Sequence, residues 1–383
     1  MSMLRDWADS NRHMITKSIV LHKLRSLASI FLVFTTVHAV GRMPASAADR
    51  VFLRTPSGLG ESRVVGNVEE FTGDQLVLRH PSGRQQTFKS DRVLRVESDW
   101  SAPHQLARAS FHRHRYQESL EEYSKALRIE KRTWVQRQQL AKITWCYRNL
   151  GQFEQASASF LALYRSDTTT QHFSAIPLVW GGRPPDMAVE RRAATLLADA
   201  EQPAGQLIGA SWLLTTAKRP EALQMLRSLT NATDARIIFL AEAQTWRTQL
   251  ATLTDADVIR MQTRVEAMPQ AIRGGPYFLL GTAQALRGQP ARAALAFLRI
   301  PIIFPEDRTL AAQALLATGS ELETINRPGE ARGLYREIIV DYADTPMAAT
   351  AQERFAAQSP SNADNATSDK NSSDKRNTEK KKH

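Results

Sequence analysis

Side chains capable of metal or nucleophilic chemistry are few in this chain of 383 residues. His112 and His114 flank a single residue, and two imidazoles at this spacing are able to share a metal ion. The sequence places no third ligand beside them, so we interpret the pair as part of an exposed turn. The single cysteine, Cys146, lies between Trp145 and Tyr147 in an apolar segment that supplies no activating base. We therefore expect Cys146 to belong to the core, and we expect no metal site.

Motifs typical of common catalytic centres are missing from the sequence. It contains no H-E-x-x-H, no P-loop, no G-x-S-x-G and no C-x-x-C. We therefore interpret the protein as non-enzymatic and expect no cofactor.

The most unusual stretch is residues 173–186, with the sequence FSAIPLVWGGRPPD. It is rich in proline and glycine and carries Trp180 and Arg183, two residue types that often anchor binding partners. One interpretation is a binding loop. The other, slightly favoured, is that Trp180 fills the interior of the surrounding helical array.

The elements that precede this stretch begin with a β-rich module over residues 50–98. Alternating apolar residues predict strands over 64–71, 75–79, 84–88 and 93–96, with turns between them. The rhythm of Gly66, Phe71, Gly73, Leu76 and Leu78 resembles SH3-like and Sm-like modules. That resemblance implies a small antiparallel β-barrel of five short strands. Its role would be either a ligand site or a structural cap on the helices.

Five helical segments follow between residues 100 and 356, and they share one pattern: a turn, a small residue, and a large apolar residue four positions later. The small residues are Ser119, Ala156, Ala222, Ala293 and Ala331, and the large ones are Tyr123, Phe160, Leu226, Phe297 and Tyr335. A further small residue lies about twelve positions before each, at Ala107, Thr144, Ala210, Gly281 and Gly319. Small side chains allow two helices to pack closely, and we expect the large ones to fill the gaps between successive hairpins.

Successive small positions are 37, 66, 71 and 38 residues apart. These intervals correspond to one or two steps of a repeat near 34 residues. The pattern resembles the tetratricopeptide repeat (TPR), which implies a mainly α fold in a right-handed α-solenoid of helical hairpins. It also predicts one hidden helix pair in 171–202 and another in 237–272, although the former contains only one clear helix.

Partners of such an array are peptides or other proteins bound along its concave face. First helices line that face, so the predicted partner-binding residues are Arg108, His112, Gln139, Arg148 and Arg287, together with Trp180 and Arg183 from the irregular stretch.

The two ends of the chain have different compositions from the middle. Residues 1–48 combine basic residues, an apolar run of about 14 residues and an A-S-A-A site, which predicts a cleavable signal peptide beginning at Met1 or Met14. If it were not cleaved, this segment would be the contact with a membrane. Residues 357–383 form a polar, basic tail that we expect to be disordered.

The net charge of +11 is partly carried by these ends, so the middle has only a weak basic bias. Nucleic acid is therefore not favoured as a partner. The leading hypothesis is an exported, non-enzymatic scaffold of the bacterial cell envelope, in the periplasm or nearby. The alternative is binding of an anionic polymer, RNA or glycan, through the β-module and the tail, which would depend steeply on salt. The sequence does not determine the oligomeric state.

Overall fold

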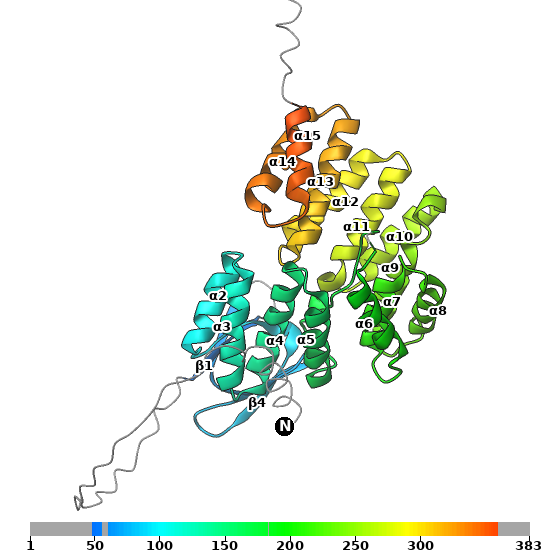
Figure 1. The fold of residues 1–383 in the computed structure, drawn as a ribbon. Helices are drawn as coiled ribbons and strands as arrows, with labels where there is room; N and C mark the ends of the chain where they lie inside the picture. The colour runs from blue at the N-terminus through cyan, green and yellow to red at the C-terminus, as the bar shows by residue number, and fades with distance from the viewer. Residues whose placement is uncertain (1–47, 56–59, 183, 359–383) are drawn as a thin grey trace, which may run out of the picture.

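A computed structural model describes residues 48–55, 60–182 and 184–358. The predicted signal peptide over 1–48 and the tail over 357–383 lie almost wholly outside these residues. Within the described part, a small antiparallel sheet of five strands is followed by fourteen α-helices (Figure 1). The prediction of a mainly α chain with an N-terminal β-module is confirmed.

The sheet has the strand order β4-β3-β2-β1-β5. Its strands are β1 (Asp49–Arg54), β2 (Glu61–Phe71), β3 (Gln75–Arg79), β4 (Gln85–Lys89) and β5 (Val93–Glu97). Strand β1 is the one that the sequence analysis did not locate. Alternate side chains face the core, as in β3, where Leu76 and Leu78 are fully buried.

The predicted barrel closure is not formed. No pairing between described residues joins β4 to β5, so the sheet is open. Instead, helix α4 (Thr133–Asn149) covers the apolar face, and its residues Trp134 and Val135 belong to the β-module core. The indole Nε1 of Trp134 donates a hydrogen bond to the Val68 carbonyl at 3.1 Å. Helix α4 therefore covers the apolar side chains that a closed barrel would have enclosed.

Polar contacts fix the β-module to the first helices. Arg137 of α4 pairs with Glu70 at 2.5 Å and also donates to the Phe71 carbonyl. The Gly73 amide donates to the Asp167 carboxylate at 3.0 Å, and the Gly73 backbone lies so close to residue 169 that a side chain would not fit. The sheet and the first helices thus form one packed unit.

The remaining helices follow in chain order: α2 (Ala102–His112), α3 (Tyr116–Ile129), α5 (Phe153–Ser166), α6 (Met187–Ala198), α7 (Pro203–Leu213), α8 (Arg219–Leu229), α9 (Ala235–Trp246), α10 (Asp255–Ala267), α11 (Gly274–Leu286), α12 (Pro290–Ile303), α13 (Arg308–Thr324), α14 (Pro328–Asp341) and α15 (Met347–Ala357). Most helices pack beside the next helix in the chain (Figure 1). Packing is looser between α5 and α6, where the irregular stretch intervenes, and between α9 and α10.

All of the small and large positions of the five helical segments are buried. Phe160 contacts Phe173 outside its own hairpin, as the sequence predicted. In two other pairs the large residue packs against the small residue of its own hairpin, as the ring of Phe297 in α12 does against Gly281 in α11. The reason is geometric: glycine lets the helices approach until the ring of one lies on the backbone of the other. In the α2–α3 pair, Ser119 instead donates a hydrogen bond to the Ala107 carbonyl at 2.9 Å.

The two hidden helix pairs have different outcomes. The segment 237–272 contains the expected helices, α9 and α10. The segment 171–202 contains only α6, preceded by a short 3-10 turn, Phe173–Ala175. This α6 packs against α7. The proline-rich and glycine-rich stretch before α6 cannot continue a helix, so no pair forms there.

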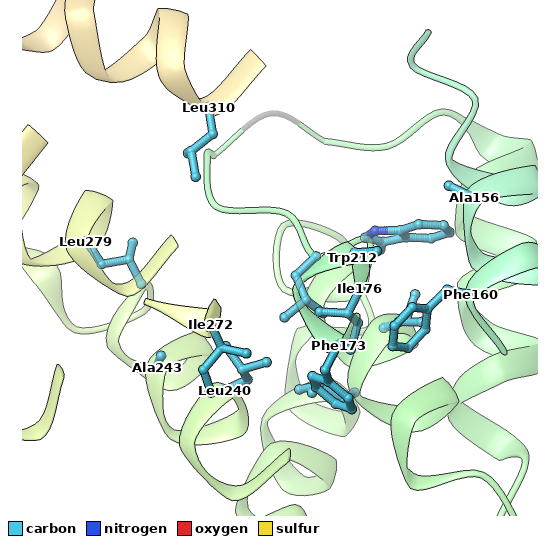
Figure 2. Close-up of a cluster of buried hydrophobic side chains, with 14 of the residues drawn as sticks. Ala156, Phe160, Phe173, Ile176, Trp212, Leu240, Ala243, Ile272, Leu279 and Leu310 are labelled. Carbon is cyan, nitrogen blue, oxygen red and sulfur yellow. The ribbon is translucent and has the colours of Figure 1, made fainter. Parts of the chain in front are cut away.

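The largest hydrophobic core runs through the helices from α2 to α13. Figure 2 shows part of it, with Phe160, Phe173, Ile176 and Trp212 gathered on one side and Leu240 and Ile272 on the other. Ile176 belongs to the irregular stretch, so this stretch is part of the core.

Candidate functional site

Residues 173–182 form an irregular segment between α5 and α6 that passes through the interior of the helical array. We call this segment the strut. Side chains of neighbouring helices bind its backbone: Trp212 Nε1 donates to the Pro177 carbonyl at 3.0 Å, and the Val179 amide donates to Ser211 Oγ at 2.9 Å. Arg247 donates to the Gly181 carbonyl at 2.6 Å. Because its backbone groups are satisfied in this way, an irregular segment can be tolerated in the interior.

The strut forms one wall of a cavity of about 600 Å³. Its other walls come from α4, from α9, from the 3-10 turn Gln270–Ile272 and the start of α11, and from the connection between α12 and α13. The lining residues are Trp145, Arg148, Ser174, Ile176, Trp180, Leu240, Gln270, Ala271, Ile272, Gly274, Gly275, Ile303, Phe304, Pro305, Glu306, Asp307 and Leu310. A volume of this size is within the range of natural ligand pockets.

Trp180 is half-buried beside Gly275, the second residue of α11. The indole lies so close to this glycine that even a methyl group at position 275 would overlap it. The strut and α11 therefore fit together through one tryptophan and one glycine. This contact supports the interpretation that Trp180 fills the interior, while its exposed part still lines the cavity.

The charged groups of the cavity are paired with each other. Arg148 forms an ion pair with Asp307 and donates to the Ser174 carbonyl at 3.1 Å. Lys142 pairs with Glu306 just outside. The Arg148 guanidinium also stacks on Trp145, 4.2 Å from the ring centroid. These pairs join α4 to the connection before α13.

Asn149 strengthens the same junction through both ends of its side-chain amide. Its Nδ2 donates to the Glu306 carbonyl at 2.9 Å, and its Oδ1 accepts from the Arg308 amide at 3.2 Å. The contacts of Lys142, Arg148 and Asn149 with residues 306–308 form what we call the α4–α13 clamp. The clamp holds distant parts of the chain together around the cavity.

Chemically, the cavity is suited to an apolar or aromatic group. Trp145, Trp180 and Phe304 provide aromatic surface, and Arg148 is already neutralised by Asp307. A charged ligand would have to compete with this internal pair. Within residues 48–358, as far as they are described, no group of three His, Cys, Asp or Glu side chains could hold a metal ion.

The buried cysteine is unsuited to nucleophilic chemistry. Cys146 is fully buried in α4, and desolvation raises the pKa of its thiol to about 12. Its thiol donates a hydrogen bond to Ser119 Oγ at 3.5 Å. The expectation that it is a core residue is confirmed.

Of the seven predicted partner-binding residues, the structure brings Arg148 and Trp180 together at the cavity. Gln139 is wholly buried and its amide contacts His104 at 3.1 Å, so the expected position on an accessible face is wrong. Arg287 pairs with Asp255 at 2.8 Å, on the surface at the end of α11. Arg183 lies outside the described residues.

The other two are not among the residues that line the cavity. Arg108 is exposed on α2, with its guanidinium 6.0 Å from the Trp100 ring. His112 is the exposed last residue of α2, in the turn that the sequence predicted.

The lining residues that sequence analysis missed include Phe304, the Gly274–Gly275 pair and the Glu306–Asp307 pair. A signal for the glycines was present, because two glycines before an apolar helix indicate a close approach of the backbone to another group. No comparable signal marks Glu306 and Asp307, since two acidic residues in a turn are ordinary.

Comparison of the chain with the models of known protein families gives no match. Comparison with curated proteins gives no significant match. None of the helices in the described residues is both long enough and apolar enough to span a membrane.

Proposed function

We propose that this chain is an exported, non-enzymatic scaffold of the cell envelope that binds proteins through its helical array. The observation that carries the proposal is the cavity beside the strut: it is large, it is lined by aromatic and aliphatic side chains, and its charges are already paired. Such a site suits an apolar side chain of a protein or peptide partner.

The family resemblance is part of this proposal. Packing of the TPR-like helical hairpins is supported by the burial of all the small and large positions and by the contact of Phe297 with Gly281. The right-handed solenoid is proposed from the resemblance alone. Export is supported by the composition of residues 1–48. Fractionation of cells and N-terminal sequencing of the mature protein test it, and a mature protein beginning near residue 48 is the expected result.

Binding is tested by filling the cavity from its rim. Ala271 is exposed, lies in the 3-10 turn Gln270–Ile272 and lines the cavity, so Ala271→Trp places an indole at the entrance without disturbing the core. Ala251 is an exposed alanine in a second 3-10 turn, Leu250–Thr252, which makes Ala251→Trp a matched control. Affinity capture from envelope extract is measured by quantitative mass spectrometry.

We expect the wild-type protein and Ala251→Trp to retain the same few envelope proteins, and Ala271→Trp to lose them. Equal retention by all three proteins would exclude the cavity as the site. Retention of nothing above a blank resin would contradict the scaffold proposal.

Polymer binding is less well supported by the β-module. Its surface arginines pair with its own glutamates, as Arg79 does with Glu69 and Arg95 with Glu61, which leaves fewer cations for a phosphate backbone. Retention that disappears with nuclease treatment or moderate salt would favour the polymer over a protein partner.

A further inference from the structure

A second hollow lies on the surface between α10 and α12 and shares no lining residue with the cavity beside the strut. Its volume is about 390 Å³, and its sides carry Ile259 of α10 and Leu295 of α12. These two aliphatic side chains are 62% and 65% exposed, and Ile302, two turns further along α12, is 75% exposed. Large aliphatic side chains gathered at one place on a surface usually mark an interaction site.

The exposed face of α12 alternates cationic and aliphatic residues. Arg292, Leu295, Arg299 and Ile302 are spaced by three or four positions, so they lie on one face of the helix over about 15 Å. We call this face the α12 stripe. A partner that matches it must present carboxylates and aliphatic groups with the same alternation.

The two arginines of the stripe have no acidic partner among the described residues. Arg299 stacks on the Tyr277 ring at 4.9 Å, and Arg292 makes only a long contact of 3.4 Å with the Gln289 side chain. The hollow has no aspartate or glutamate in its lining. By contrast, Arg264 and Arg287 in the neighbouring helices pair with Glu242 and Asp255.

The floor of the hollow contains a polar group without a partner. Gln284 of α11 is only 4% exposed, and its Oε1 makes no hydrogen bond with any described residue. A buried acceptor left unpaired costs roughly 1–3 kcal/mol. A donor from a bound partner would relieve this cost.

We propose that the α12 stripe and the hollow beside it bind an acidic amphipathic helix of another protein. Aliphatic side chains of that helix lie between Ile259 and Leu295 and against Ile302, and carboxylates one turn away pair with Arg292 and Arg299. A helix is favoured over an extended segment because the groove runs between two helices and its contacts repeat every three or four residues. This surface is separate from the cavity, so the two are tested independently.

The experiment places the photo-crosslinking residue p-benzoylphenylalanine at Leu295 of the full-length protein in the organism that encodes it. Crosslinked peptides are identified by mass spectrometry. The control position is Leu106 of α2, an aliphatic residue of similar exposure, 57%, outside the stripe. The same experiment is repeated with Arg292→Glu and Arg299→Glu together, and with Ala271→Trp.

We expect crosslinks from Leu295, and not from Leu106, to one segment of another protein that has aliphatic residues at helical spacing and glutamates or aspartates beside them. The double arginine variant should reduce this crosslink roughly five- to tenfold, while Ala271→Trp leaves it unchanged. Lysines in place of the partner's carboxylates should restore the crosslink to the double variant.

Crosslinks to a second copy of this chain, to lipid or to segments without acidic residues would overturn the proposal. So would a yield no greater than that at Leu106, or a yield that the double variant does not change. The substituted arginines are on the surface, and an unchanged melting temperature of the double variant confirms that it is folded. A loss of the Leu295 crosslink in Ala271→Trp would also overturn the proposal, because the partner would then depend on the cavity and not on the stripe.

Discussion

The ring of Phe297 lies on the backbone of Gly281, so close that a Cβ atom at position 281 would be 2.6 Å from it. The same arrangement recurs between Tyr335 and Gly319 in the next pair of helices. In both cases a ring in the second helix occupies the space that a side chain would need in the first. These contacts set the distance between the helices.

Replacing Gly281 by alanine should therefore destabilise the protein, although alanine is the better helix former by about 1 kcal/mol. The added methyl overlaps the Phe297 ring, and overpacking of this kind costs about 1–3 kcal/mol. Urea denaturation measures the free energy of unfolding. Gly333→Ala is the control, because Gly333 is exposed in α14 and has open space around it, so this change should be neutral or stabilising. Equal effects of the two substitutions would contradict the proposed contact.

Trp134 should be the residue that holds the β-module to the helices. Trp134→Ala removes a fully buried indole from the β-module core and should cost about 3–5 kcal/mol. Trp134→Phe keeps most of the packing but leaves the Val68 carbonyl without its donor, so a loss of about 1–2 kcal/mol is expected. Hydrogen exchange over residues 61–79 should rise far more in the alanine variant. Uniform changes along the chain would argue against a local role.

Removing one partner of the ion pair between Arg148 and Asp307 should lower the free energy of unfolding strongly, whereas replacing both partners by apolar residues should lower it little. Both side chains are largely buried, so Asp307→Ala leaves an unpaired cation and should destabilise by about 3–5 kcal/mol. The double variant Arg148→Met, Asp307→Leu should recover most of that loss. Small-angle scattering provides a second readout, because a broken clamp should increase the radius of gyration. A double variant as unstable as Asp307→Ala would contradict this account.

The free energy of unfolding should decrease as the pH is lowered, because of His104. This imidazole stacks on Trp100 at 4.5 Å and contacts Gln139, and desolvation, assisted by the charge of Arg108, lowers its pKa from 6.5 to about 4. The folded protein therefore keeps His104 neutral while the unfolded chain binds a proton. The contribution of neutral His104 to the free energy of unfolding is intact above pH 6.5. It is lost as the pH falls toward 4, and the loss is at most roughly 3 kcal/mol.

Urea denaturation at several pH values between 7.5 and 4.5 checks this prediction. His104→Gln should make the free energy of unfolding depend less on pH over this interval, whatever its effect at pH 7.5. A remaining slope is expected from His172, whose pKa desolvation and Lys142 also lower to about 4. An unchanged slope in the variant would mean that His104 is already accessible to protons.

The periodic features of the fold were predictable from the sequence. Small and large residues four positions apart predicted the burial of Ala293 and Phe297, and strand alternation predicted the burial of Leu76 and Leu78. These patterns are local, and they record which face of an element is buried. The turn containing His112 and the core position of Cys146 were predicted on other grounds, because the sequence offers no third metal ligand and no activating base beside them.

Features that depend on distant partners were not predictable. The strut is ordered by side chains of α7 and α9, such as Trp212 and Arg247, and nothing in residues 173–182 indicates those donors. Arg148 was assigned to partner binding because a single sequence does not show that its carboxylate is Asp307. Sheet closure failed for a similar reason, since the helix that carries Trp134 covers the sheet.

The α4–α13 clamp also has a consequence for when the molecule becomes complete. Lys142 and Glu306 are separated by 164 positions, so a nascent chain exposes α4 long before its partner is synthesised. Arrays with only neighbouring contacts can form step by step from the first repeat, but this one needs a long loop to close. Loop closure of this kind slows folding, and until it occurs the walls of the cavity remain apart. Each newly made molecule therefore passes through a period in which its helices can exist but the cavity cannot.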